Sequence, residues 1–128
     1  MRVFKTRWFA RYARRERIAD ESLSEAIERA ERGIVDADLG DGLIKQRIAR
    51  KGQGRSGGYR MLLAYRVGHR AIFLFGFAKN HLDNIDPEQL RKWRIAALDM
   101  LTLGDNEIEY EVDEGELEEI NYEEDFSR

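Results

Sequence analysis

Three basic residues in the middle of the chain have the chemistry to bind a phosphate group. Lys45 and Arg47 alternate along one apolar stretch, 43–49, and Arg60 lies in a second, 58–67. Alternate residues of a strand share one face, so Lys45 and Arg47 are expected to point the same way. A guanidinium grips a phosphate through two parallel donors. Phosphoryl transfer can run largely on positioning and electrostatic stabilisation of the transition state.

A turn predicts how Arg60 is placed against the next strand. The dipeptide Gly-His at 68–69 suits a two-residue hairpin turn with Gly first, and this register sets Arg60 opposite Phe77. Lys79 then lies diagonally next to Arg60 on the same face. An arginine at the end of a buried strand usually pairs with an acid or binds an anion, and 45–70 contains no acid. The plainer alternative is that these cations simply reach solvent.

The glycine-rich segment RKGQGRSGGYR, residues 50–60, raises the question of a nucleotide site. Its G-x-G-x-x-G spacing marks a dinucleotide site only where a strand precedes it and a helix follows, with an acid about 20 positions on. Here β-forming residues follow and no such acid is present, so the nucleotide interpretation fails. We expect the glycines to form a flexible hairpin connection that carries cations toward a phosphate backbone.

The remaining titratable residues give no recognisable catalytic or metal-binding motif. His69 belongs to the predicted turn and is expected to be exposed. His81 follows the end of the last apolar stretch, where it is either a proton-transfer group or an ordinary loop histidine. Two isolated histidines lack metal-ligand spacing, and the chain has no cysteine. No metal site and no cofactor are therefore predicted.

Composition and charge restrict the kinds of protein that this chain can be. At 128 residues and 42% hydrophobic, the chain suits one domain with a modest core. No stretch approaches the ~20 apolar residues of a membrane span, so a cytoplasmic protein without membrane association is expected. Residues 1–104 hold 21 Lys/Arg and 13 Asp/Glu, whereas residues 105–128 hold one Arg and 12 Asp/Glu. This separation suggests a body attracted to polyanions and an acidic appendage.

The periodicity predicts an α+β fold. The expected elements, in chain order, are a strand at 2–5, a helix at 7–16, a helix opened by the capping box at 22–25, a loop at 36–42, strands at 43–49, 58–67 and 70–78, and a long helix ended by Gly104. A short helix at 106–113 and an edge strand at 116–122 follow. Strands that are apolar on both faces predict a sheet covered by helices on both sides.

The same order and three sequence stretches resemble the RelE/HigB superfamily of bacterial toxin–antitoxin toxins. The stretches are LIKQRIAR (43–50), GGYRMLLAYRV (57–67) and AIFLFGFAKN (71–80). The resemblance implies a small fold like that of microbial ribonucleases. Its antiparallel sheet of about four strands would be packed by an N-terminal helical hairpin and a C-terminal helix. A toxin domain at 1–104 would precede a partly ordered acidic extension at 105–128.

In that family the RNA 2′-hydroxyl attacks the neighbouring phosphate, with Arg and Lys holding the developing charge, and cleavage takes place on the ribosome. Carried over, the resemblance assigns Arg60 to the family arginine after Gly-Tyr, and Lys45, Arg47 and Lys79 to the other basic positions. Many members have a second Arg where Asn80 stands, and a Tyr or His where this chain has 85–86. The substitutes considered for the missing acid–base group are His81 and Tyr59. The RNA- or ribosome-binding cations would be Arg50, Lys51, Arg55 and Arg66.

The resemblance implies partners and leaves alternatives. The partners would be messenger RNA, the ribosome and an antitoxin, expected to be a helix-turn-helix protein of the HigA kind. A gyrase-poisoning toxin of the ParE kind and a non-catalytic nucleic-acid-binding module remain the alternatives to a metal-independent endoribonuclease. The acidic extension would dock and mimic nucleic acid or antitoxin, or only aid solubility, or complete the core through Leu117, Ile120 and Tyr122.

Overall fold

The computed structural model describes residues 1–50, 54–78 and 86–122; for residue 50 and residues 54–57 only the backbone is described. The elements in chain order are β1 (Arg2–Thr6), α1 (Arg7–Glu16), α2 (Asp20–Glu31), β2 (Ala37–Gly40), β3 (Leu43–Arg50), β4 (Gly54–Arg66), β5 (Arg70–Ala78), α3 (Pro87–Thr102), α4 (Asp105–Asp113) and β6 (Leu117–Ile120).

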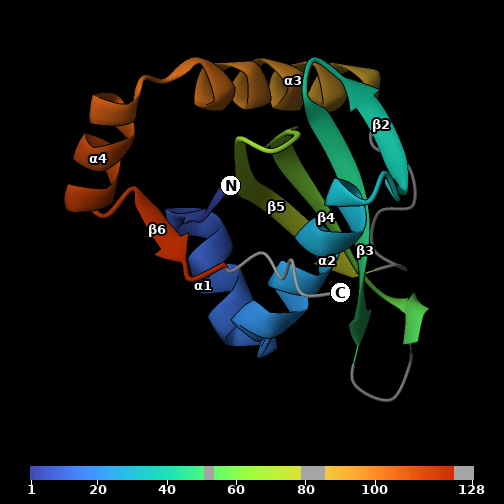
Figure 1. The fold of residues 1–128 in the computed structure, drawn as a ribbon. Helices are drawn as coiled ribbons and strands as arrows, with labels where there is room; N and C mark the ends of the chain where they lie inside the picture. Colours follow the sequence, from blue (N-terminus) through green and yellow to red (C-terminus); the bar gives the residue numbers. More distant parts are fainter. Residues whose placement is uncertain (51–53, 79–85, 123–128) are drawn as a thin grey trace.

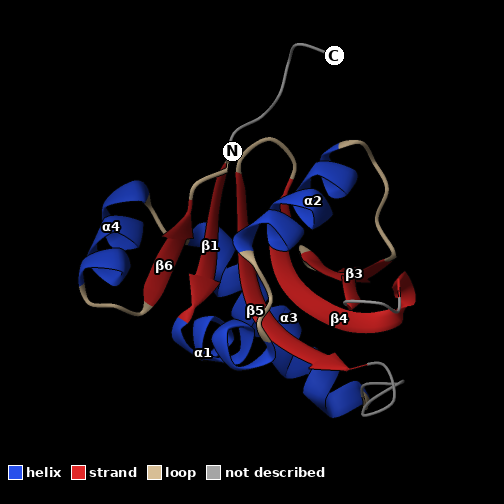
Figure 2. Cartoon of the chain, turned by 90° about the horizontal axis from the view of Figure 1, so that it is seen from below, coloured by secondary structure: helices blue, strands red, loops and turns tan. Residues whose placement is uncertain are grey.

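The strands form one six-stranded sheet in the order β2-β3-β4-β5-β1-β6. Only the pairing of β1 with β5 is parallel, and the other neighbours are antiparallel. Figure 2 shows β6 and α4 at one edge of the sheet and β3 toward the other. The fold is α+β, as predicted, and the four central strands are β3, β4, β5 and β1. The two edge strands, β2 and β6, raise the count to six.

Helices cover both faces of the sheet, which explains why the central strands are apolar on both sides. On one face α1 and α2 pack on a buried cluster that includes Phe9, Ile27 and Met61. On the other face α3 packs through Ala97 and Leu101 on Leu62 and its neighbours, and Figure 1 shows α3 lying across the strands. Successive residues of β4 alternate between the two clusters, so the face of each side chain on β4 follows from its number.

Two predicted elements need correction. The second helix begins at Asp20 with Ala19 as its N-cap, not at the capping box of 22–25. It ends at Glu31, so Ile34 lies beyond it and is 51% exposed. The predicted loop at 36–42 contains β2, a four-residue edge strand with a register shift. Its Asp and Gly residues are typical of turns, and pairing with β3 overrides that preference.

The hairpin of β4 and β5 corrects the predicted turn but keeps the predicted register at Arg60. The connection has three residues, 67–69, and Arg66 lies opposite Arg70, so the two-residue turn was wrong. Further along, the register shifts between Leu62 and Leu63, because β5 contributes one extra residue to the ladder. Arg60 is therefore opposite Phe77 after all. An extra residue of this kind is a β-bulge, which redirects the side chains that follow it.

Residues 105–120 are built into the same core as the rest of the chain. Ile108 and Leu117 are buried with the α3-side cluster, Ile120 is buried with the α1/α2-side cluster, and Tyr122 packs against the latter. Antiparallel pairing joins β6 to β1 from Val3↔Ile120 to Thr6↔Leu117. The helix and edge strand predicted from 106–113 and 116–122 are both present, and together they extend the sheet beyond β1.

Candidate functional site

The antiparallel pairing of β3 and β4 places Arg47 directly opposite Arg60. Lys45 is opposite Leu62, so it lies on the same face of the sheet, two residues along β3. That face is the one covered by α3, because Leu43 and Leu62 pack in the α3-side cluster. We refer to Lys45, Arg47 and Arg60 as the cation cluster. It lies midway along β4, next to the end of β5 at Ala78.

Two like charges opposite each other on neighbouring strands destabilise a sheet. Arg47 and Arg60 form such a pair, and the cost is partly offset by Asp36, which precedes β2. The Arg47 guanidinium donates from Nη2 to Asp36 Oδ1 at 3.2 Å, and the Arg47 backbone N–H donates to Asp36 Oδ2 at 2.6 Å. One carboxylate therefore accepts from both the backbone and the side chain of Arg47.

Asp36 is held as an anion. Its burial would raise the pKa, but hydrogen bonds from the Arg47 backbone and guanidinium, with the positive charges of Arg47 and Arg29, hold the pKa of Asp36 below its ordinary value. Asp36 was not among the residues predicted from the sequence. The stretch 45–70 contains no acid, and residue 36 falls in the segment that was expected to be a loop. Only the pairing of β2 with β3 brings it beside Arg47.

Tyr59 lies away from the cation cluster. It is buried in the cluster under α1 and α2, and its hydroxyl donates to Glu16 Oε1 at 3.2 Å. Because neighbouring residues of a strand point to opposite faces, Tyr59 and Arg60 are on different sides of the sheet. The structure therefore does not bring Tyr59 to the cluster as a substitute acid–base group.

Arg66 lies at the opposite end of β4, where it pairs with Arg70 beside the turn. Six residues at a rise of about 3.3 Å put Arg66 ~20 Å from Arg60. Lys79, His81 and Lys51, and the side chains of Arg50 and Arg55, lie outside the described residues. The last described residue of β5, Ala78, is opposite Tyr59. The chain thus leaves β5 at the end of the sheet that carries Arg60.

The glycine-rich segment does not open a helix. Its backbone from Gly54 onward belongs to β4, and Arg50 of β3 lies opposite Gly54 in the ladder. The expected hairpin connection, at 51–53, lies outside the described residues, while β4 continues without a helix as far as Arg66, which does not fit the dinucleotide interpretation. Among the described residues, no group of three or more His, Cys, Asp or Glu side chains is placed to hold a metal ion.

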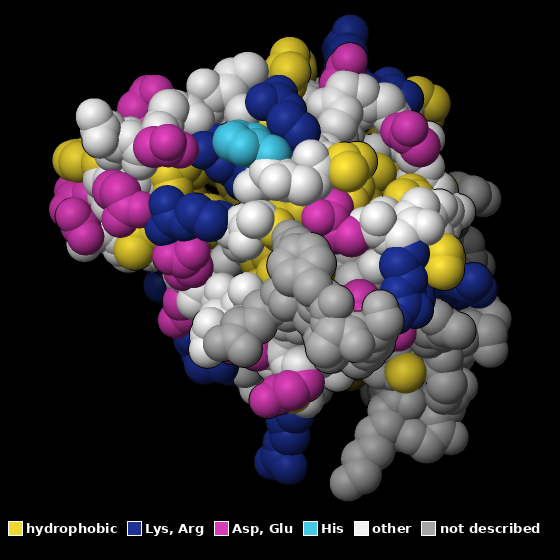
Figure 3. Space-filling model, in the orientation of Figure 1, with side chains coloured by type: hydrophobic (Ala, Val, Ile, Leu, Met, Phe, Trp, Pro, Cys, Tyr) yellow, Lys and Arg dark blue, Asp and Glu magenta, His cyan; other side chains and the backbone are white. Residues whose placement is uncertain are grey.

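Acidic residues of β6 and of the segment before it are paired with N-terminal cations. Lys5 Nζ lies 3.0 Å from Glu118 Oε2, Arg2 Nη2 lies 2.8 Å from Glu119 Oε1, and Arg7 Nη2 of α1 lies 3.0 Å from Glu116 Oε1. Hydrogen bonds from Arg2 lower the pKa of Glu119. In Figure 3 acidic side chains gather over α4 and β6. Two strands, β5 and β1, separate β6 from β4.

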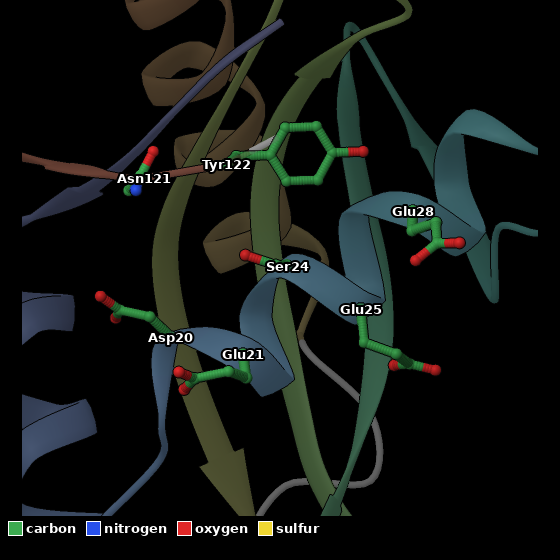
Figure 4. Close-up of a pocket in the computed structure, with 7 residues that line it drawn as sticks. All are labelled: Asp20, Glu21, Ser24, Glu25, Glu28, Asn121 and Tyr122. Carbon is green, nitrogen blue, oxygen red and sulfur yellow. The ribbon is translucent and has the colours of Figure 1, made fainter. Parts of the chain in front are cut away.

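A pocket of about 280 Å³ lies between α2 and the segment after β6. Figure 4 shows carboxylates of α2 around it, with Tyr122 on the other side. Its lining residues are Asp20, Glu21, Ser24, Glu25, Glu28, Asn121 and Tyr122. Four of the seven are acidic and none is basic, so this pocket would repel a phosphate. It does not compete with the cation cluster as an anion site.

Comparison with known proteins agrees with the geometry. Residues 1–120 match a family model described as the RelE toxin of the RelE/RelB toxin–antitoxin system. The match extends through α4 and β6. The comparison with curated proteins finds no match. Of the helices described, none has the length and apolar character needed to cross a membrane.

Proposed function

This chain belongs to the RelE toxin family, and from that membership we propose that it is a ribosome-dependent endoribonuclease that cleaves messenger RNA. As a RelE toxin it is one half of a toxin–antitoxin pair. We further propose that its antitoxin is a helix-turn-helix protein of the HigA kind, and that the toxin acts in the cytoplasm, where translation takes place.

The observation that carries the proposal is the cross-strand pair of Arg47 and Arg60. A sheet gains nothing from two adjacent guanidinium groups, but an anion between them relieves their repulsion and accepts several charge-assisted hydrogen bonds. A phosphodiester with its two non-bridging oxygens suits this pair. Lys45 on the same face adds a third positive charge.

In the proposed reaction the RNA 2′-hydroxyl oxygen forms a bond to the adjacent phosphorus while the bond to the 5′-oxygen breaks. The products are a 2′,3′-cyclic phosphate and a 5′-hydroxyl end. Negative charge on the phosphoryl oxygens grows toward the transition state. Arg60 and Arg47 stabilise that charge without reorganising, because the strands hold their backbones fixed. Lys79 is proposed to act from the segment that follows β5.

Mapping of RNA 5′ ends after induced expression tests this function. We expect new 5′-hydroxyl ends within the reading frame of a reporter messenger RNA, and their loss when the start codon of the reporter is mutated so that ribosomes do not enter it. Cuts that persist without the start codon would refute the dependence on the ribosome. Growth arrest with DNA damage and no new RNA ends would instead identify a gyrase poison, and RNA binding without either would identify a non-catalytic module.

Neutralising the cation cluster is expected to weaken RNA binding and to flatten its salt dependence. For single-stranded RNA, each phosphate that a protein neutralises adds about 0.7 to the slope of log K against log salt. We therefore expect Lys45→Ala and Arg47→Ala each to reduce the slope by roughly that amount, measured with a short single-stranded RNA. Arg32→Ala is the matched control, because it removes the same charge from an exposed side chain at the end of α2, on the other face of the sheet. Equal slopes for all three variants would contradict this assignment.

A further inference from the structure

Arg47 pairs with β4 on one side of its strand, and on the other side its backbone is bound by the side chains of Asp36 and Arg29. The pairing of β2 with β3 starts at Ala37, opposite Lys45. Beyond that point the Arg47 N–H donates to Asp36 Oδ2 at 2.6 Å. The Arg47 carbonyl accepts from Nη2 of Arg29 on α2. These two side chains replace the missing hydrogen bonds of a neighbouring strand at the residue opposite Arg60.

The network around Asp36 is largely buried and has charges of both signs. The side chains of Asp36 and Arg29 are 13% and 8% exposed, and Arg29 Nη1 lies 3.4 Å from Asp36 Oδ2. The Asp36 N–H donates to Oε1 of buried Gln46 at 2.7 Å. The Gln46 amide in turn donates to the Ala26 carbonyl of α2 at 3.0 Å. The carboxylate is thus fixed from several directions, while the Arg47 side chain that it binds remains 43% exposed.

Arg47 is consequently bound on its buried side and open on its outer side. The Asp36 carboxylate attracts the guanidinium and opposes its repulsion by Arg60 across the ladder. It also places a negative charge within one side-chain length of any phosphate that binds the pair. The same group therefore has two opposite effects on RNA: it orients Arg47, and it lowers the local positive potential.

We propose that Asp36 is a positioning residue of the phosphate site, which fixes Arg47 beside Arg60 for the transition state and weakens the binding of RNA before reaction. This inference rests on the proposed function, because it assigns a role within the same cleavage site. A positioning role predicts opposite changes in RNA affinity and in cleavage rate, whereas loss of a purely structural residue would lower both. Without the carboxylate, RNA should bind more tightly and react more slowly.

The test is Asp36→Asn in cleavage of messenger RNA on ribosomes, measured in single turnovers at increasing toxin concentration. Asparagine keeps the shape and an acceptor for the Arg47 N–H but removes the charge. We expect the half-saturating toxin concentration to fall roughly three- to tenfold, because one nearby negative charge is gone. The rate at saturation should fall on the order of tenfold, because Arg47 is no longer held in place. Glu25→Gln is the matched control: Glu25 binds Arg29 as Asp36 does, with Nε to Oε1 at 3.0 Å, and should change neither quantity by more than about twofold.

A second comparison separates positioning from folding. If Asp36 acts through Arg47, the double variant Asp36→Asn/Arg47→Ala should have the same saturating rate as Arg47→Ala, since coupled residues are not additive. A slower double variant would overturn the assignment, and so would an Asp36→Asn protein that matches the wild type in both quantities. Weaker binding together with a lower rate, in proportion to a loss of folded protein in thermal melts, would reduce Asp36 to a purely structural role. If the wild-type protein does not cleave messenger RNA, the proposed function is refuted and this inference falls with it. If the wild type cleaves and Arg60→Ala does not, the proposed function stands, and the Asp36 variants then test this inference by itself.

Discussion

Arg60→Ala is expected to abolish growth arrest and to lower messenger RNA cleavage by on the order of 10²–10³, the effect of removing one preorganised donor to a developing oxyanion. Arg60 lies opposite both Arg47 and Phe77 on central strands, so its backbone is fixed by ladders on both sides. Arg60→Lys should also fail, since a point charge does not replace two parallel donors. Cleavage on ribosomes and colony growth on induction measure the two effects.

Thermal melting is the control for this prediction. Arg60 is half-buried, and removal of one of two opposed cations relieves repulsion, so the variant should melt close to the wild-type temperature. An Arg60→Ala protein that is soluble, folded and fully toxic would exclude the cation cluster as the site. Arg32→Ala serves again for comparison, because it removes an exposed arginine outside the cation cluster.

Deletion of residues 105–128 is expected to leave a protein that does not fold. The deletion removes three buried residues, Ile108, Leu117 and Ile120, which are each at most 3% exposed. Truncation of a single buried Leu or Ile to Ala typically costs about 2–5 kcal/mol, against a total stability of about 5–15 kcal/mol for a domain. The loss of β6 also exposes the edge of β1. Solubility and circular dichroism of the truncated chain measure this outcome.

Point variants measure how much single residues of 105–128 stabilise the fold, without removing the negative charge of the extension. Ile120→Ala should lower the free energy of unfolding by about 2–4 kcal/mol, whereas Tyr110→Ala, at a side chain that is 62% exposed, should stay within about 0.5 kcal/mol. A truncated protein that is folded and binds RNA more tightly would show instead that the extension inhibits the site. A truncated protein that is folded and binds RNA as the wild type does would show that the extension serves only as a solubilising segment.

The sequence was sufficient to predict features that depend on local patterns. Apolar stretches bounded by turn residues predicted β3, β4 and β5 to within a few residues at most ends, and Gly104 predicted the end of α3 to within two residues. The face shared by Lys45 and Arg47 followed from strand periodicity, whereas the place of Arg60 opposite Arg47 comes from the ladder of β3 and β4. These properties depend on residues near one another in the chain, so they can be predicted from composition and spacing.

Features that depend on distant contacts were not predictable in this way. The pairing of β2 with β3 was missed because its residues favour turns, and with it the carboxylate of Asp36 beside Arg47. Tyr59 was considered for catalysis on its place in the sequence next to Arg60, although the two side chains lie on opposite faces of the sheet. The placement of Arg60 opposite Phe77 was right even though the turn was wrong, because the bulge shifts the register by one residue.

The bulge has a consequence for comparison with other toxins of the family. Leu74 is the extra residue of β5, since Phe73 is opposite Leu63 and Phe75 is opposite Leu62. A relative with a regular strand would reach the residue opposite Arg60 one position earlier in its chain. Alignment of this chain with such a relative therefore requires a one-residue gap at Leu74. Without that gap, every residue beyond the strand, including Asn80 and His81, is compared with the neighbour of its true counterpart, and a conserved side chain can be scored as missing when it is only displaced by one.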